Sequence, residues 1–279
     1  MIAVALALGA AVAWGAADFL GGLKSRVVAT IVVVAVGQVA GLVLVGAVVI
    51  ARGEGPPEGR YLAYAVLAGF AGALGIAALY RALAVGSMSI VAPITATGVV
   101  IPVVAGVATG ERPTAVQGVG LAFAFGGVVF AARQHANDQT SRRVAAGVGV
   151  ALVAAVGIGS FLLAIDAASE GGVPWALLVQ RSVCVAIVLA VAAFVRPRFR
   201  VGRENAGPMV AIGVLDMSAN ALFALASTRG LVSVVSVLAS LYPVTTVLLA
   251  RLLLGERVVR TQQLGVVAAL VGVVLITAG

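Results

Sequence analysis

The chain has 279 residues, of which 62% are hydrophobic and 10% are charged, and its formal net charge is +8. Soluble domains are close to half apolar and a quarter charged, so this composition excludes an ordinary soluble globular domain. A membrane-crossing helix needs about 20 mostly apolar residues, which leaves little of this chain for any part outside a membrane. The 35 glycines favour helices that pack closely in lipid.

The basic residues lie in short gaps between apolar runs and are not gathered on one face. This pattern is typical of loops beside an anionic lipid leaflet, and it argues against nucleic acid as a partner. The single cysteine, Cys184, lies inside an apolar run and cannot form an internal disulfide. We interpret it as a small buried hydrophobic residue.

Ten apolar stretches predict ten membrane-spanning helices. The first has no positively charged leader region before it, so we expect it to be retained as a span. Gly and Pro residues mark the breaks between stretches, and no loop exceeds about a dozen residues, so function is expected within the membrane. The stretches are 1–22, 27–51, 61–80, 82–110, 113–132, 144–165, 171–195, 205–228, 230–250 and 261–279.

The two halves of the chain, 1–132 and 144–279, repeat each other. Eight residues recur at a constant offset of 145 (255 − 110). Because each half holds five predicted helices, an odd number, the second half must enter the membrane from the opposite side. We therefore predict an all-α membrane protein with ten transmembrane helices in two inverted five-helix repeats, an architecture that places substrate sites between the repeats. The matches join Gly110, Glu111, Arg112, Gln117, Gly120, Gly127, Val128 and Val129 to Gly255, Glu256, Arg257, Gln262, Gly265, Gly272, Val273 and Val274.

Several motifs resemble the EamA-type branch of the drug/metabolite transporter superfamily. They are the run from Trp14 to Gly22, Ser89 to Pro93, the paired Gly-Glu-Arg turns, and Ser240 to Pro243. The resemblance covers both halves. It implies a ten-helix bundle in the cell membrane that carries small metabolites, amino acids or drugs through a central cavity by alternating access, usually outward. The chain departs from the family's pattern at Pro243. This proline has no partner in the first half, where Gly98 stands at the equivalent position.

The distribution of Lys and Arg predicts the orientation. The odd-numbered loops carry eleven of these residues and the even-numbered loops carry four. By the positive-inside rule both termini then face away from the cytoplasm. The resemblance implies the reverse, with both termini inside, and we follow the charges.

Polar residues within the spans are the candidates for a substrate site, because a charge in mid-membrane is costly and marks function by default. Asp216 lies about ten residues into its span, and Asn220 follows one turn later on the same face. Asp216 could bind a proton or a cationic substrate group, or it could be a fixed structural charge. Arg181, beside Gln180, could reach Asp216 from a neighbouring antiparallel helix and could bind a carboxylate substrate; the alternative is that it extends to the nearer surface.

The remaining candidates are weaker. Gln38 lies in the middle of its span, and Trp14, Tyr242 and Ser240 could line a cavity, although the Ser240 hydroxyl could instead bond to its own helix. Asp18, near the end of the first span, is interpreted as an interfacial carboxylate or a site residue, and Tyr80 as part of the interfacial aromatic belt. The predicted substrate-binding residues are Asp216, Asn220, Arg181, Gln180, Gln38, Trp14, Asp18, Tyr242 and Ser240.

Other function classes receive less support from the sequence. The single histidine, His135, lies in a loop, so no Ser/His pair or His-based metal site can form within the membrane, and we expect neither an enzyme nor a bound metal or cofactor. There is no ATP-binding loop, so transport would be driven by a coupling proton or cation or by substrate exchange. A channel-like pore is the alternative, and a homo-oligomer is left open.

Overall fold

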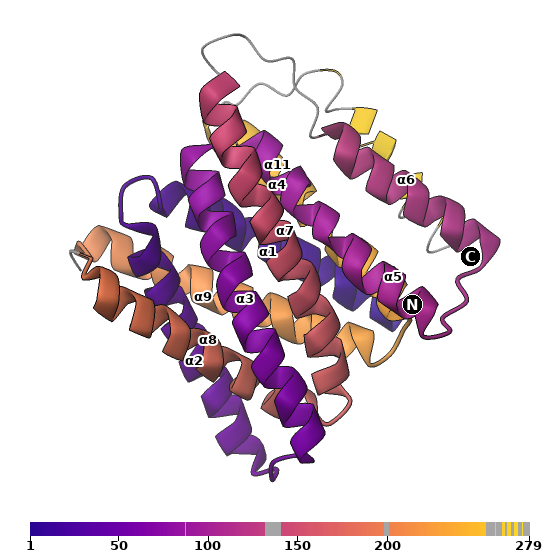
Figure 1. The fold of residues 1–279 in the computed structure, drawn as a ribbon, viewed down its shortest axis with the longest axis horizontal. Helices are drawn as coiled ribbons and strands as arrows, with labels where there is room; N and C mark the ends of the chain where they lie inside the picture. The colour runs from indigo at the N-terminus through magenta and orange to yellow at the C-terminus, as the bar shows by residue number, and fades with distance from the viewer. Residues whose placement is uncertain are drawn as a thin grey trace.

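The computed structural model describes residues 1–86, 88–131, 141–197 and 201–254, together with isolated positions between 260 and 275 (Figure 1). Every regular element in these parts of the chain is a helix. Six helices are long: α1 (Ile2–Lys24), α2 (Thr30–Arg52), α3 (Gly59–Val85), α7 (Ser141–Ser169), α8 (Val173–Val195) and α9 (Arg203–Ser227). The others are α4 (Met88–Ala96), the 3-10 turn η1 (Thr97–Val99), α5 (Val100–Ala108), α6 (Ala115–Ala131), α10 (Val232–Ala239) and α11 (Tyr242–Leu254).

The all-helical class is confirmed, whereas the count of ten spans is not. Seven helices among the described residues are long and apolar enough to cross a membrane, with Val232–Leu254 counted as one. Two further apolar helices, Ile94–Ala108 and Ala115–Gly127, are shorter. The predicted tenth span, 261–279, lies outside the continuously described chain.

Glycine and proline end the helices where the sequence predicts breaks. Gly53 follows α2 with φ 63°, and Gly172 precedes α8 with φ 126°. Both are conformations that a residue with a Cβ atom rarely adopts. Pro174 lies in the first turn of α8, where its missing N–H costs nothing.

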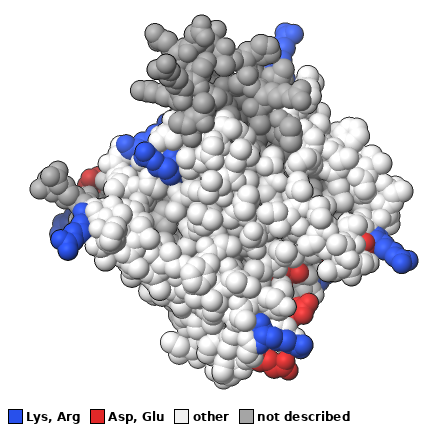
Figure 2. Space-filling view, in the orientation of Figure 1, with Lys and Arg blue, Asp and Glu red and all other residues white. Residues whose placement is uncertain are grey.

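The surface between the helix ends is apolar. Figure 2 shows charged side chains near the edges of the molecule, with a broad uncharged region between them. Large apolar side chains are exposed on the molecule, among them Phe70, Leu74 and Phe194, the last 91% exposed. In water such a surface would aggregate, but in a bilayer it faces lipid tails. The chain is a multi-pass integral membrane protein.

The longest interfaces join one half of the chain to the other. Helix α1 runs antiparallel to α9: Lys24 Nζ donates to Asn205 Oδ1 at 3.0 Å at one end, and Ala3 lies against Gly230 at the other. Helix α3 packs in the same way along α7. The first helix of each half therefore packs on the third helix of the other half.

Glycines allow α3 and α7 to approach closely. A Cβ atom on Gly157 would lie 2.7 Å from Gly75 Cα, and one on Gly75 would lie 3.0 Å from the backbone nitrogen of Ile158. Small residues at such crossings are typical of helix association in membranes, where packing has to replace the hydrophobic effect.

Both halves contain a span that is interrupted at a similar place. Helix α4 gives way to η1 at Thr97–Val99 before α5 begins, and α10 is separated from α11 by a turn at Ser240 and Leu241. An offset of 145 relates Gly98 in the first break to Pro243 just after the second. Interrupted helices in corresponding positions of two repeats are the usual marker of a transporter's binding site.

Candidate functional site

All nine predicted site residues line one cavity in the interior of the helix bundle. They come from α1, α2, α8, α9, the turn after α10, and the start of α11. Ala96 and Val99, at the break in the first half, line the same cavity. The cavity volume is about 70 Å³, which holds roughly five water molecules.

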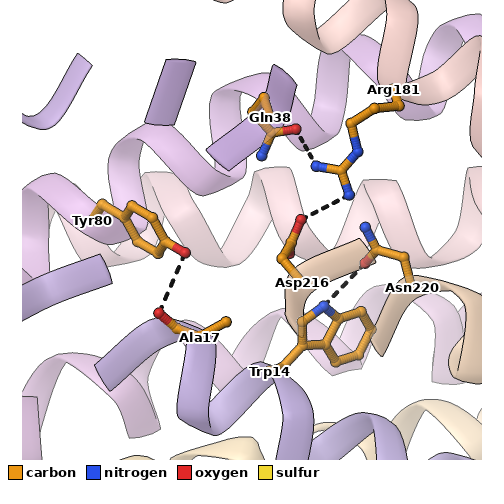
Figure 3. A network of polar contacts seen from close by, with 7 residues as sticks. All are labelled: Trp14, Ala17, Gln38, Tyr80, Arg181, Asp216 and Asn220. Atoms are coloured by element: carbon orange, nitrogen blue, oxygen red, sulfur yellow. Dashed lines mark hydrogen bonds and ion pairs between the residues drawn. The ribbon is translucent and has the colours of Figure 1, made fainter. Parts of the chain in front are cut away.

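A buried ion pair forms one wall of the cavity (Figure 3). Arg181 Nη2 lies 2.7 Å from Asp216 Oδ2, and the Arg181 side chain is 1% exposed. Arg181 Nη1 donates to Gln38 Oε1, which ties α8 to α2. Gly41 leaves room for the guanidinium, since a Cβ atom there would lie 3.3 Å from Arg181 Nε. Arg181 therefore does not extend to the surface, because its charge is matched inside the bundle.

The ion pair leaves polar atoms without partners. Among the described residues, Arg181 Nε and Gln180 Oε1 are buried and have no hydrogen-bond partner. Native structures rarely leave buried polar atoms unpaired, so each such atom calls for an explanation. Both atoms belong to residues that line the cavity.

Trp14 and Asn220 connect α1 to α9 next to the ion pair (Figure 3). Trp14 Nε1 donates to Asn220 Oδ1 at 3.0 Å. The Trp14 ring also lies 5.7 Å from that of Phe223, measured between centroids. The indole is thereby fixed with its polar edge toward the cavity.

Asp18 lies inside the helix bundle and not on its outer surface. It is 4% exposed and lines the cavity, while Lys24 bonds to Asn205 instead. Tyr80 is likewise inside the bundle, 1% exposed, so its assignment to the aromatic belt is wrong. The reason is length: α3 continues to Val85, which places Tyr80 more than a turn from the helix end.

Tyr242 joins the two broken spans. Its phenol lies 2.7 Å from Thr95 Oγ1, across a hydrogen bond in which either oxygen can donate. Thr95 was not among the predicted site residues. Ser240 lines the cavity, and its hydroxyl also donates to Val237 O at 2.7 Å, so both roles considered for it occur together.

A wider vestibule of about 1,060 Å³ lies on one side of the molecule. Its walls include residues from four loops, which are every second loop between the spans. These loops follow α2, α5, α7 and α9. The N-terminal end of α1 lies beside Gly230 in this wall, whereas α7 ends there at Ser169. The first helices of the two halves therefore run in opposite directions relative to the vestibule.

Glu111 makes a contact that sequence reasoning did not anticipate. Its carboxylate accepts hydrogen bonds from Val232 N at 2.6 Å and Ser233 N at 3.1 Å. It therefore caps α10, a helix of the other half whose own N-cap residue, Leu231, makes no side-chain cap. The repeated Gly-Glu-Arg turn was the available signal, but a spacing along the chain does not say which helix end a side chain reaches.

No catalytic or metal-binding cluster is evident in the described part of the chain. No group of three or more His, Cys, Asp or Glu side chains there is placed to hold a metal ion. Cys184 is buried beside the cavity and has no disulfide partner. His135 lies outside the described residues.

Comparison with known proteins identifies the family. The EamA-like transporter family matches residues 1–133 and again residues 145–278. The chain belongs to the EamA-like transporter family. The double match shows two EamA units in tandem, and it makes this chain a membrane transporter of the drug/metabolite type.

Other comparisons bear on the fold alone. One solved crystal structure of a protein aligns over 99% of this chain and 97% of its own length, with a TM-score of 0.76 and 16% sequence identity. At that identity the likeness extends to the fold and no further. No curated protein matches the chain.

Proposed function

We propose that this EamA-family protein is a secondary active transporter of the cell membrane that exports a small organic metabolite, amino acid or drug-like compound. The observation that carries the proposal is the buried cavity lined by Arg181, Asp216 and Asp18 between helices of both halves. Charged groups within a membrane protein are costly and are kept for binding or coupling. Such a cavity suits a ligand that crosses the membrane.

Alternating access is supported by the pairing of the two halves. Helices α1 and α7 run in opposite directions relative to the vestibule, and each packs on the third helix of the other half. Such a pair of inverted repeats can exchange conformations, which exposes a fixed central site first to one side and then to the other. The broken spans at Thr97–Val99 and Ser240–Leu241 give each half a point at which to bend.

A channel-like pore is the second candidate. The small central cavity and the network around Arg181 argue against an open water-filled path. Catalysis has less support still, because members of the family are transporters.

Two experiments test the proposal. Metabolite profiling of cells with and without the protein should show one class of compound accumulating outside the expressing cells. In proteoliposomes, that compound should then show counterflow, in which excess unlabelled substrate inside drives uptake of labelled substrate. Uptake that does not respond to internal substrate would indicate a pore, and internal accumulation in cells would reverse the direction of transport.

A further inference from the structure

The charges of the central cavity do not balance. Among the described residues that line it, three are charged: Asp18, Arg181 and Asp216. Arg181 is engaged by Asp216 at 2.7 Å and by Gln38. One carboxylate is therefore left over, and it is that of Asp18.

Asp18 is buried without a polar partner. It is 4% exposed, and within the described chain it takes part in no hydrogen bond or ion pair. An ionised carboxylate in such a place costs several kcal/mol unless a positive charge accompanies it. A stable arrangement therefore requires something that brings one positive charge to this carboxylate.

Aromatic side chains lie in and beside the same cavity. Trp14 precedes it by one turn on α1 and lines the cavity. Tyr242 of α11 lines the cavity as well, and the Tyr80 hydroxyl of α3 donates to the backbone oxygen of Ala17, the residue before Asp18. Aromatic rings beside an anion are the usual surroundings of a bound ammonium group, which is attracted to their faces.

We propose that Asp18 is the binding site for the ammonium group of a small organic cation, and that a proton occupies this carboxylate when the substrate is absent. The inference rests on the proposed function, since it names the class of substrate transported. Each occupant brings one positive charge to Asp18, so substrate and proton compete for it. Loading then releases one proton from the carboxyl oxygen as the ammonium group replaces it, and the cavity stays neutral.

Other ionisable groups near Asp18 do not supply this charge. Asp216 of α9 is a second carboxylate, and the phenols of Tyr80 and Tyr242 cannot carry a positive charge. Arg181 of α8 is the one cation among the described residues that line the cavity, and it is paired. Lys24, on the same helix, is bonded to Asn205.

Trp14 offers a direct readout of this site. The chain has two tryptophans, so Trp175→Phe leaves Trp14 as the sole fluorescent indole, one turn from Asp18. Ethylammonium is a suitable probe because its three heavy atoms fit a cavity with room for roughly five waters. In purified Trp175→Phe protein, ethylammonium chloride should change Trp14 fluorescence saturably and release protons into a weakly buffered solution, whereas sodium acetate at equal ionic strength should do neither.

Variants then assign the effect to the carboxylate. Asp18→Asn should weaken ethylammonium binding about tenfold or more and abolish proton release, because a charged hydrogen-bond partner is removed. Asp18→Glu should retain both effects, which also guards against a folding defect in the Asn variant. Glu58→Gln, which removes an exposed carboxylate on the surface, should behave like its parent.

The outcomes separate this inference from the proposed function. Unchanged binding in Asp18→Asn, a response to acetate alone, or no response of the parent protein to ethylammonium would each overturn the inference. Counterflow in proteoliposomes is measured separately. If binding needs Asp18 but no counterflow occurs, the site stands and the transport proposal fails; if a metabolite shows counterflow while ethylammonium does not bind, transport stands and the substrate class is wrong.

Discussion

Arg181 on α8 and Asp216 on α9 form an ion pair of 2.7 Å inside the bundle, where the Arg181 side chain is 1% exposed. Removing one partner of a buried pair typically costs about 3–5 kcal/mol, because the other charge is left unpaired. We expect Asp216→Asn to lose transport and to lower the melting temperature of the purified protein. The measurements are counterflow and size-exclusion chromatography after heating.

A double variant separates mechanism from scaffolding. In Asp216→Asn with Arg181→Gln, neither member of the pair is left as an unpaired charge, so we expect stability to recover without transport. Recovery of both would show that the pair only holds the helices together. Full activity in Asp216→Asn alone would remove Asp216 from the site.

Glu111 should stabilise the protein by capping α10. Its carboxylate accepts from the backbone nitrogens of Val232 and Ser233, and losing such a cap costs about 0.5–2 kcal/mol. We expect Glu111→Ala to lower the melting temperature and Glu111→Gln to lower it less, because the amide oxygen can still accept one bond. Glu58→Ala is the matched control, since Glu58 stands at the N-cap of α3 and makes no side-chain cap. Equal effects at the two positions would contradict the capping role.

The crossing of α3 and α7 should tolerate no added methyl group. In Gly157→Ala the new Cβ atom would meet Gly75 Cα at 2.7 Å, and overpacking of this kind costs about 1–3 kcal/mol. Thermal unfolding should therefore occur at a lower temperature. Gly46→Ala on α2 is the control, because a Cβ atom there meets nothing within 4 Å, and its melting temperature should stay within error of the parent or rise.

The vestibule should open away from the cytoplasm. Glu54 lies in its wall and Arg196 follows α8, so the two mark an even-numbered and an odd-numbered loop. In a Cys184→Ser background, a membrane-impermeant maleimide added to intact cells should label Glu54→Cys and spare Arg196→Cys until the cells are opened. The parent protein controls for background because Cys184 is buried. A fluorescent protein fused after Gly279, which lies outside the described residues, should correspondingly stay dark. The reverse labelling pattern would invert the orientation and leave the repeat argument intact.

The sequence predicts how far a residue lies from the end of its span, because each residue advances an α-helix by 1.5 Å. This is why Arg181 and Asp216, placed at compatible depths on antiparallel helices, are found in contact. The hydrophobic pattern also separates residues within the membrane spans from residues in the loops. It placed all nine candidate residues in the spans, and all nine line the cavity.

What the sequence does not supply is the end of each helix and the identity of its neighbours. Tyr80 was assigned to the interface because Arg81 ended the charge-free stretch, yet the helix continues while Arg81 lies exposed. The contact of Tyr242 with Thr95 joins residues separated by 147 positions. Such contacts depend on how helices rotate and cross, and that depends on packing over whole interfaces.

The antiparallel pairing of α1 with α9 has a consequence for biosynthesis. Trp14 and its partner Asn220 are 206 residues apart, and at 5–20 residues per second the ribosome needs about 10 to 40 seconds to make that length. Throughout this interval α9 does not yet cover the face of α1 that carries Gly9 and Trp14. Insertion machinery or neighbouring early helices must shield that face until α9 emerges, so retention of the nascent first span is a step at which assembly of this protein can fail.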